Sequence, residues 1–243
     1  RPPFRAAQAA LLFPTGGYHW PGMGSDVDRT AGREVFDRVD AALVSEGAPP
    51  GALRRLMAGE DQARRQRDAA GWSWSGDFPL SMVAQMALGA ALAEAFEARH
   101  GTPAVLAGES MGELAAYCAA GALPLEPAAL LTHRWAGALQ SASDALGLRM
   151  AVVEDLEEEQ FQPIAAALEA HVVVSEAPRL FVAALPAARL DELDREVARR
   201  GGRTLVSNNP CAAHEPRLAK SAEIWEEHAR FLEALPFTLP RIP

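Results

Sequence analysis

The stretch Gly108-Glu109-Ser110-Met111-Gly112 constrains the fold more than any other part of the sequence. It lies between the apolar segment AVLAG at 104–108 and the small-residue segment MGELAAYCAAG at 111–121. These flanking patterns predict a buried strand, a sharp turn and a helix. Glycines on both sides of the serine permit the strained turn that exposes its hydroxyl. The pattern therefore favours the α/β class, with strands of one parallel sheet alternating with helices.

Other segments agree with an α/β core. Residues 9–17, AALLFPTGG, form an apolar run that ends in Pro and Gly, which predicts a strand followed by a tight loop. Residues 27–70 have a charged, helix-rich character, and GWSWSGDFP at 71–79 is predicted to be a loop. A helix is predicted from Leu80 to His100, and a further helix contains LLTHRWAGALQ.

Residues 149–207 have a different rhythm, in which the predicted elements follow the order β-α-β-β-α-β. This order is the split βαβ pattern of ferredoxin-like subdomains. We therefore predict an α/β-hydrolase-like core with a parallel sheet, made of residues 1–148 and 208–243, and a ferredoxin-like inserted subdomain at 149–207.

The bulk properties exclude several classes of protein. A formal charge of −9 disfavours binding to nucleic acid and to anionic membranes. Cys118 and Cys211 are the only cysteines and lack metal-type spacing, which predicts buried thiols without a disulfide or zinc. No uninterrupted apolar run approaches membrane-spanning length and the start lacks a signal layout, so we expect a cytoplasmic protein. The start at Arg1 suggests a piece of a larger polypeptide.

A serine nucleophile needs a base, and the sequence offers six histidines. His214 lies in the loop SNNPCAAHEP, directly after the last strand of the predicted insert, from which it can return toward Ser110. His19 in a predicted loop and His133 in a predicted helix are the alternatives. The backbone N–H of Met111, at the predicted helix start, would face an oxyanion beside the serine.

The chain resembles the acyltransferase domains of polyketide and fatty-acid synthases and the malonyl-coenzyme A:carrier-protein transacylases. The motifs that carry the resemblance occur in the family's order: FPTGGYHWPGMG at 13–24, GESMGE at 108–113, AAGAL at 119–123 and CAAH at 211–214. The resemblance covers essentially the whole chain.

The resemblance implies a two-step transfer through a serine acyl-enzyme. Ser110, deprotonated by His214, attacks the thioester of an acyl-coenzyme A, and the phosphopantetheine thiol of an acyl carrier protein then takes the acyl group. The oxyanion is held by the backbone N–H groups of Met111 and of Gly16, which stands where the family has glutamine. No metal or other cofactor is implied, and the neighbouring domains of a multidomain synthase are the further partners.

Several positions depart from the family pattern. Trp135 stands where members that take malonyl groups have an arginine, and Arg134 could serve only if the alignment shifts by one residue. Glu109 replaces the histidine before the nucleophile, and its charge would repel a substrate carboxylate. Ala213 replaces a Phe or Ser that accompanies malonyl or methylmalonyl selectivity, and Cys211 opens the same motif. Together these residues indicate a non-carboxylated starter acyl group.

The resemblance also implies that the domain continues past the segment PRIP, into a part whose asparagine carbonyl orients the catalytic histidine. Two alternatives remain open. One is an acyl-thioester hydrolase that uses the same serine and histidine but releases the acyl group to water. The other is a degenerate, noncatalytic domain that binds carrier proteins.

Overall fold

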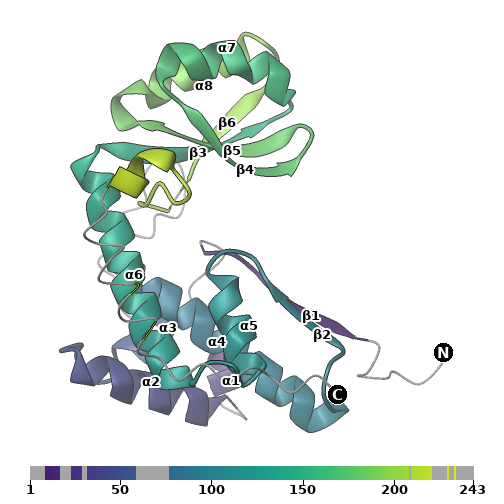
Figure 1. Cartoon of the computed structure of the whole chain (residues 1–243), viewed down its shortest axis with the longest axis vertical. Helices are drawn as coiled ribbons and strands as arrows, with labels where there is room; N and C mark the ends of the chain where they lie inside the picture. The colour runs from purple at the N-terminus through teal and green to yellow at the C-terminus, as the bar shows by residue number, and fades with distance from the viewer. Residues whose placement is uncertain are drawn as a thin grey trace. The chain divides into compact units, whose positions relative to one another are not determined.

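The structure is a computed structural model that describes residues 9–16, 23–28, 32–58, 77–207, 209–220, 229 and 233 (Figure 1). The chain divides into two compact units, which we describe separately. Residues Arg1–Ala136 and His228–Pro243 form the first, and Gly137–Glu227 form the second. The boundary falls inside helix α6 (Leu125–Ala145). The subdomain limits at 149–207 stay a prediction.

The first unit contains the parallel strand pair expected from the sequence. Strand β1 (Ala10–Phe13) pairs with β2 (Val105–Gly108), and Phe13 lies opposite Gly108 at the end of the register. Helices α4 (Phe78–His100) and α5 (Gly112–Ala119) lie beside the pair in Figure 1. Phe13 belongs to the same buried cluster as residues of both helices, so one face of the pair is covered by the core.

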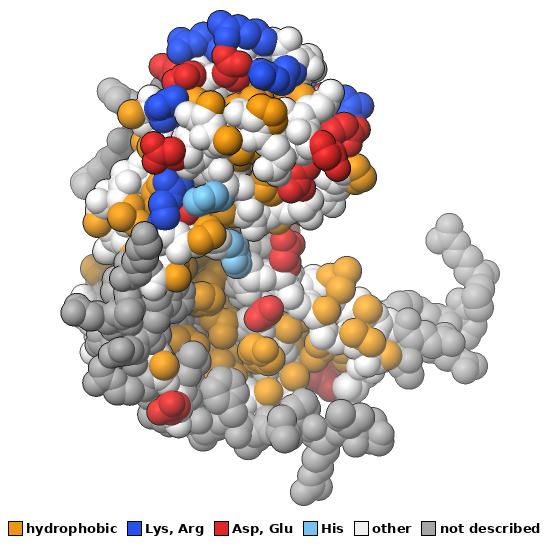
Figure 2. Space-filling view, turned by 45° about the horizontal axis from the view of Figure 1, so that its top comes forward, with side chains coloured by type: hydrophobic (Ala, Val, Ile, Leu, Met, Phe, Trp, Pro, Cys, Tyr) orange, Lys and Arg blue, Asp and Glu red, His pale blue; other side chains and the backbone are white. Residues whose placement is uncertain are grey.

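The other face of the strand pair is apolar and exposed. Successive side chains of a strand point to opposite faces, and here Leu12 is 76% exposed and Val105 53% exposed. Figure 2 shows hydrophobic side chains at the surface of this part of the first unit. Parallel sheets are usually buried on both faces, but among the described residues the core covers only the face of this pair that carries Phe13.

Helix α4 is the central element of the first unit. Helices α1 (Ser25–Asp28), α2 (Arg33–Ser45) and α3 (Ala52–Ala58) all contact it, as does α5. Its small and apolar residues supply much of the buried cluster, including Val83, Ala87 and Ala91.

The start of α4 corrects one prediction. A loop was predicted for residues 71–79. Residues 71–76 lie outside the described part of the chain, but Phe78 and Pro79 are already helical. Asp77 is the N-cap, because its side chain accepts a hydrogen bond of 2.9 Å from the backbone N–H of Leu80. Proline is tolerated in the first turn of a helix, so the helix begins before Leu80.

Helix α4 is long and apolar. By length and composition, it is the one helix among the described residues that is apolar enough to cross a membrane, although Gln85, Glu94 and Glu97 interrupt its apolar residues. However, 56% of its most apolar window is buried inside the structure, and the core helix of a soluble protein passes the same test. The helix is therefore weak evidence for a membrane span.

The second unit has the element order that the sequence predicts. Strand β3 (Leu148–Glu154), helix α7 (Glu158–Leu168), strands β4 (His171–Ala177) and β5 (Leu180–Pro186), helix α8 (Leu190–Ala198) and strand β6 (Arg203–Val206) follow one another. They form one sheet in the order β4-β5-β3-β6, with all neighbours antiparallel. Short 3-10 helices occupy Ala187–Arg189 and Pro216–Lys220.

The two faces of this sheet are covered differently. Helices α7 and α8 cover one face through a buried cluster that includes Phe161, Phe181 and Leu193. Figure 2 shows positively and negatively charged side chains together at the surface of this unit, and they form ion pairs such as Arg200 with Glu196 at 2.9 Å. A smaller cluster joins sheet residues to Ala212 and Leu218. The segment 209–220, which contains His214, is therefore packed against the sheet.

The Asp77 cap provides a test of the α4 start. We expect Asp77→Ala to lower the free energy of unfolding by about 1 kcal/mol, because an orphan N–H of the central helix loses its acceptor. Urea unfolding followed by circular dichroism measures the change. Asp77→Asn keeps an acceptor oxygen and should unfold close to the wild-type midpoint; equal losses in both variants would show that the cap is not the cause.

Candidate active site

Ser110 lies in the turn between β2 and α5, as the sequence predicts. Its backbone has a φ of 52°, in the left-handed region that L-residues other than glycine rarely adopt. Among the described residues, only Ser110, Asp155, Glu169 and His214 share this feature without being glycine. Such conformations cost of order 1–3 kcal/mol and cluster at functional sites. Both residues predicted to carry the chemistry therefore have this strained backbone.

The two glycines of the motif allow the turn because no side chain fits at either position. A Cβ on Gly112 would lie 2.3 Å from the carbonyl oxygen of Phe13 and 2.7 Å from that of Pro14. A Cβ on Gly108 would lie 2.2 Å from the carbonyl carbon of Gly112. Backbone atoms cannot move aside as a flexible side chain can, so the start of α5 packs directly against the ends of β1 and β2.

Gly16 and Met111, the two residues predicted to donate to the oxyanion, are neighbours in the first unit. A Cβ built on Gly16 would lie 3.8 Å from Cγ of Met111. The amide group of Gln85, from α4, donates to the carbonyl oxygens of Pro14 and Thr15 and so fixes the loop that carries Gly16. Within the described part of the chain, the backbone N–H of Met111 has no hydrogen-bond acceptor. This N–H can therefore donate to a bound oxyanion.

His214 lies in the second unit, whereas Ser110 lies in the first. Its φ is 63°, and it occupies a turn in which the N–H of Glu215 donates to the carbonyl of Ala212 at 3.3 Å. The N–H of Ala212 in turn donates to the hydroxyl of Ser143, on α6, at 2.9 Å. His214 itself is exposed, and Ala213 beside it is half-buried.

Other histidines and the two cysteines are the alternatives to His214 as base and to Ser110 as nucleophile. His133 is half-buried on α6, and His19 lies outside the described residues. Burial raises the pKa of the Cys118 thiol to about 12 and that of Cys211 to about 11. Both thiols are therefore protonated at neutral pH and are poor nucleophiles. Within the described ranges, no group of three His, Cys, Asp or Glu side chains could hold a metal ion.

The residues predicted to select the acyl group lie on several elements. Arg134, on α6, donates from both Nε and Nη2 to the Glu46 carboxylate at the end of α2, with an Nε–Oε2 distance of 3.1 Å. The hydrogen bonds from Arg134 hold the pKa of Glu46 below its usual range. Trp135 is half-buried against the core of the first unit, and Glu109 is exposed. Cys211 is fully buried, with its sulfur 3.5 Å from the hydroxyl of Ser143.

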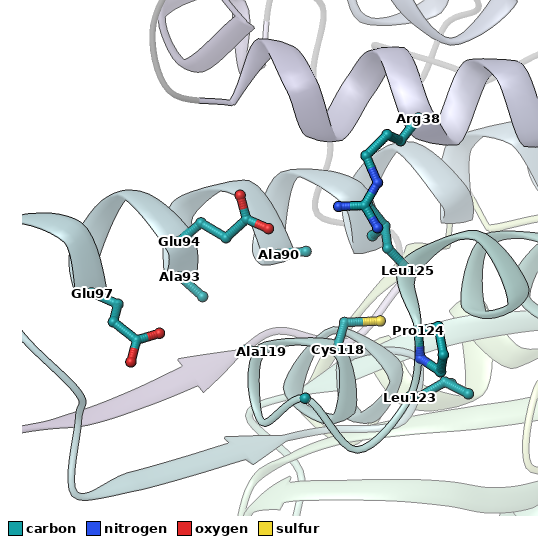
Figure 3. A pocket seen from close by; sticks show the side chains of 11 residues that line it. Arg38, Ala90, Ala93, Glu94, Glu97, Cys118, Ala119, Leu123, Pro124 and Leu125 are labelled. Carbon is teal, nitrogen blue, oxygen red and sulfur yellow. The ribbon is translucent and has the colours of Figure 1, made fainter. Parts of the chain in front are cut away.

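The first unit also contains a pocket that is separate from the turn of Ser110. It has a volume of about 350 Å³ and lies near the C-terminal end of α5, between α4 and the loop that leads to α6 (Figure 3). Cys118, Glu94 and Arg38 are among its lining residues, and Arg38 pairs with Glu126 at 2.7 Å. Ser110 and Met111, at the opposite end of α5, do not line it.

Four polar residues that position the predicted site residues or their neighbours could not be found from the sequence. These are Glu46, Gln85, Ser143 and Glu215. Three of them contact partners between 69 and 88 positions away in the sequence, so no local pattern indicates them. Glu215 adjoins His214, but a single Glu in a loop carries no signal of burial.

Comparisons with known proteins agree on one family. Residues 11–233 match the acyl transferase domain family. The polyketide synthase GfsA of Streptomyces halstedii is 28% identical over 97% of this chain, a match that spans 3% of that synthase. The chain is thus a small part of the length of this relative.

Solved structures share the fold. The acyl transferase domain of SpnD, in complex with 2-(pent-4-yn-1-yl)malonyl, has a TM-score of 0.77 at 25% identity, over 99% of this chain and 54% of that chain. The malonyl CoA-acyl carrier protein transacylase of Coxiella burnetii has a TM-score of 0.77 at 20% identity, over 99% of this chain and 73% of that one. The mixed α/β architecture, with a parallel and a four-stranded antiparallel sheet, matches these domains.

The glycine contacts provide a test of the turn. We expect Gly112→Ala to destabilise the first unit by about 2 kcal/mol or more, because its Cβ would meet two backbone carbonyls. Gly121 is the matched control beyond the other end of α5, since it has a φ of 67° and open space around a Cβ. Gly121→Ala should therefore cost only about 1 kcal/mol. If thermal unfolding shows the same loss of stability in the two variants, the close contact of Gly112 with the two carbonyls is contradicted.

Proposed function

The chain belongs to the acyl transferase domain family, and on that premise we propose that it transfers acyl groups from coenzyme A thioesters to acyl carrier proteins. The acyl group is carried in between by an oxygen ester on Ser110. The observation that supports this proposal most strongly is the left-handed backbone of Ser110 between two glycines that admit no side chain. This geometry serves to present a hydroxyl beside the N-terminus of a helix.

In the first half-reaction, the Ser110 hydroxyl oxygen attacks the thioester carbonyl carbon while His214 takes the hydroxyl proton. The negative charge that develops on the carbonyl oxygen is stabilised by the N–H groups of Met111 and Gly16. The intermediate then collapses, the carbon–sulfur bond breaks, and the coenzyme A sulfur takes the proton from His214. The products are the Ser110 ester and free coenzyme A.

In the second half-reaction, the phosphopantetheine thiol of a carrier protein attacks the Ser110 ester. His214 takes the thiol proton and returns it to the serine oxygen as the ester bond breaks. The product is an acyl thioester on the carrier, and the serine is restored. No cofactor takes part in either step.

The acyl group that we propose is uncharged, of the monocarboxylic starter type. Trp135 presents an indole where a cation would be needed to pair with a malonyl carboxylate. Arg134, the adjacent cation, is bound to Glu46 through two hydrogen bonds, which favours a structural role. Glu109 adds a negative charge one residue before Ser110. The acyl group thus differs from the malonyl groups that the names of the solved relatives specify.

The proposed setting is a multidomain synthase of polyketide or fatty-acid biosynthesis in the cytoplasm. The similarity to a short part of a polyketide synthase supports this setting. We also interpret the first unit as an α/β-hydrolase-like core and the four-stranded sheet as a ferredoxin-like insert, since the β-α-β-β-α-β order is that of a split βαβ motif.

Intact-mass spectrometry after incubation with a panel of acyl-coenzyme A thioesters tests the proposed transfer. We expect acetyl, propionyl or longer monocarboxylic adducts on the wild type and none on Ser110→Ala, which lacks the nucleophile. Ser141→Ala, at an exposed serine of α6, should be acylated like the wild type. Adducts that persist in Ser110→Ala would reject the nucleophile. Rapid loss of the adduct to water in the presence of carrier protein would favour a hydrolase.

The selectivity has its own test. Trp135→Arg should raise malonyl loading relative to acetyl loading by about tenfold or more, because a charge-assisted pair with the substrate carboxylate is gained. Trp135→Phe keeps an aromatic ring without a charge and should leave the preference unchanged. Arg134→Ala should also leave it unchanged; a loss of malonyl loading in that variant would instead assign the substrate carboxylate to Arg134.

A further inference from the structure

Glu215, directly after His214, is the only charged side chain among the described residues that is fully buried. Its side chain has an exposed fraction of 0%. Charged side chains are almost never fully buried unless they are paired, so the partners of this carboxylate need an explanation. All of them lie in the second unit, like His214.

One oxygen of the carboxylate accepts three hydrogen bonds. Oε1 of Glu215 lies 2.7 Å from Nδ1 of His171, 2.7 Å from Nε of Arg217 and 3.1 Å from the backbone nitrogen of Arg217. Burial by itself raises the pKa of Glu215, but the hydrogen bonds from Arg217 and His171 outweigh it and hold the pKa below its usual range. The carboxylate is therefore ionised at neutral pH, and Nδ1 of His171 is the donor.

These partners tie the His214 turn to the junction between α7 and β4. His171 is the first residue of β4, and Glu169 is the C-cap of α7. Arg217 donates from Nη2 to the carbonyl of Glu169 at 3.1 Å while its Nε contacts Glu215. The segment after His214 is thus attached to the sheet through two side chains.

The segment before His214 is attached as well. The N–H of Ala212 donates to Ser143, and the N–H of Glu215 donates back to the carbonyl of Ala212. The left-handed backbone of His214 costs roughly 1–2 kcal/mol and persists only where the surroundings impose it. Ala212 on one side and Glu215 on the other are the residues that impose it here.

Stability alone does not account for the carboxylate. Oε2 of Glu215 is buried and has no hydrogen-bond partner within the described residues. A buried charge that is only half satisfied is a poor source of stability, and an apolar side chain is often as good or better. The geometry that the network fixes around His214 therefore explains the buried carboxylate better than stability does.

We propose that Glu215 is a positioning residue, which holds His214 through His171 and Arg217 in the orientation that takes the proton of Ser110. This inference rests on the proposed function, in which His214 is the base. A displacement of about 1 Å in a reacting group can reduce a rate by about 10²-fold. Loss of the network should therefore slow the reaction of Ser110 while the fold remains.

The test is the rate at which Ser110 of the full chain reacts with a fluorophosphonate, a reagent that needs an activated serine but no particular acyl group. Glu215→Gln keeps the size of the side chain and removes its charge, and we expect the rate to fall about tenfold or more. His171→Ala removes one partner at a side chain that is 47% exposed, so it should fold and show a smaller loss. Arg179→Ala breaks an ion pair with Glu157 in the same unit, away from the loop, and should react like the wild type.

A double-mutant cycle separates positioning from a general structural effect. If Glu215 acts through His214, then Glu215→Gln should cause no further loss in the His214→Ala background. An equal loss in both backgrounds, or wild-type rates in Glu215→Gln and His171→Ala, would overturn the proposal. A wild type that reacts with the fluorophosphonate but with no acyl-coenzyme A would contradict only the proposed function. A wild-type Ser110 that does not react would overturn both.

Discussion

The contact of Gly112 with the carbonyl oxygens of Phe13 and Pro14 determines the geometry of the first unit around Ser110. Because α5 begins directly against the end of β1, the chain has only the residues 109–111 in which to turn from strand to helix. This short connection places Ser110 in the left-handed region and leaves the N–H of Met111 without an acceptor in the described part of the chain. The same contact brings the loop of Gly16 beside Met111.

The turn at His214 reaches a left-handed backbone by a different physical route. No glycine flanks it, and hydrogen bonds hold its neighbours. The hydroxyl of Ser143 accepts from the backbone N–H of Ala212 on one side, and the buried Glu215 accepts from Arg217 on the other. The strained backbone of Ser110 therefore depends on nearby glycines, which have no side chain to clash, whereas that of His214 depends on a buried charge. Substitutions near Ser110 should act mainly through packing, whereas substitutions near His214 should act through electrostatics and hydrogen bonding.

The sequence predicts the elements of the fold well because their signals are local. The strand, turn and helix around Ser110 and the β-α-β-β-α-β order after Leu148 follow from short apolar periods and glycine positions. The start of α4 was predicted two residues late because the Asp77 cap and the proline in the first turn look like a loop. The pairing of Arg134 with Glu46 spans 88 positions, so periodicity and motif reasoning cannot reveal it. Burial of Glu215 likewise depends on tertiary contacts alone.

Peptide mapping of the trapped acyl-enzyme tests the central claim most directly. After brief incubation with an acyl-coenzyme A and digestion, tandem mass spectrometry locates the acyl group on a single residue. The account predicts an oxygen ester on Ser110, with Cys118 and Cys211 unmodified because burial keeps both thiols protonated. An acyl group found on either cysteine, or on another serine with Ser110 unmodified, would contradict the assignment of the nucleophile.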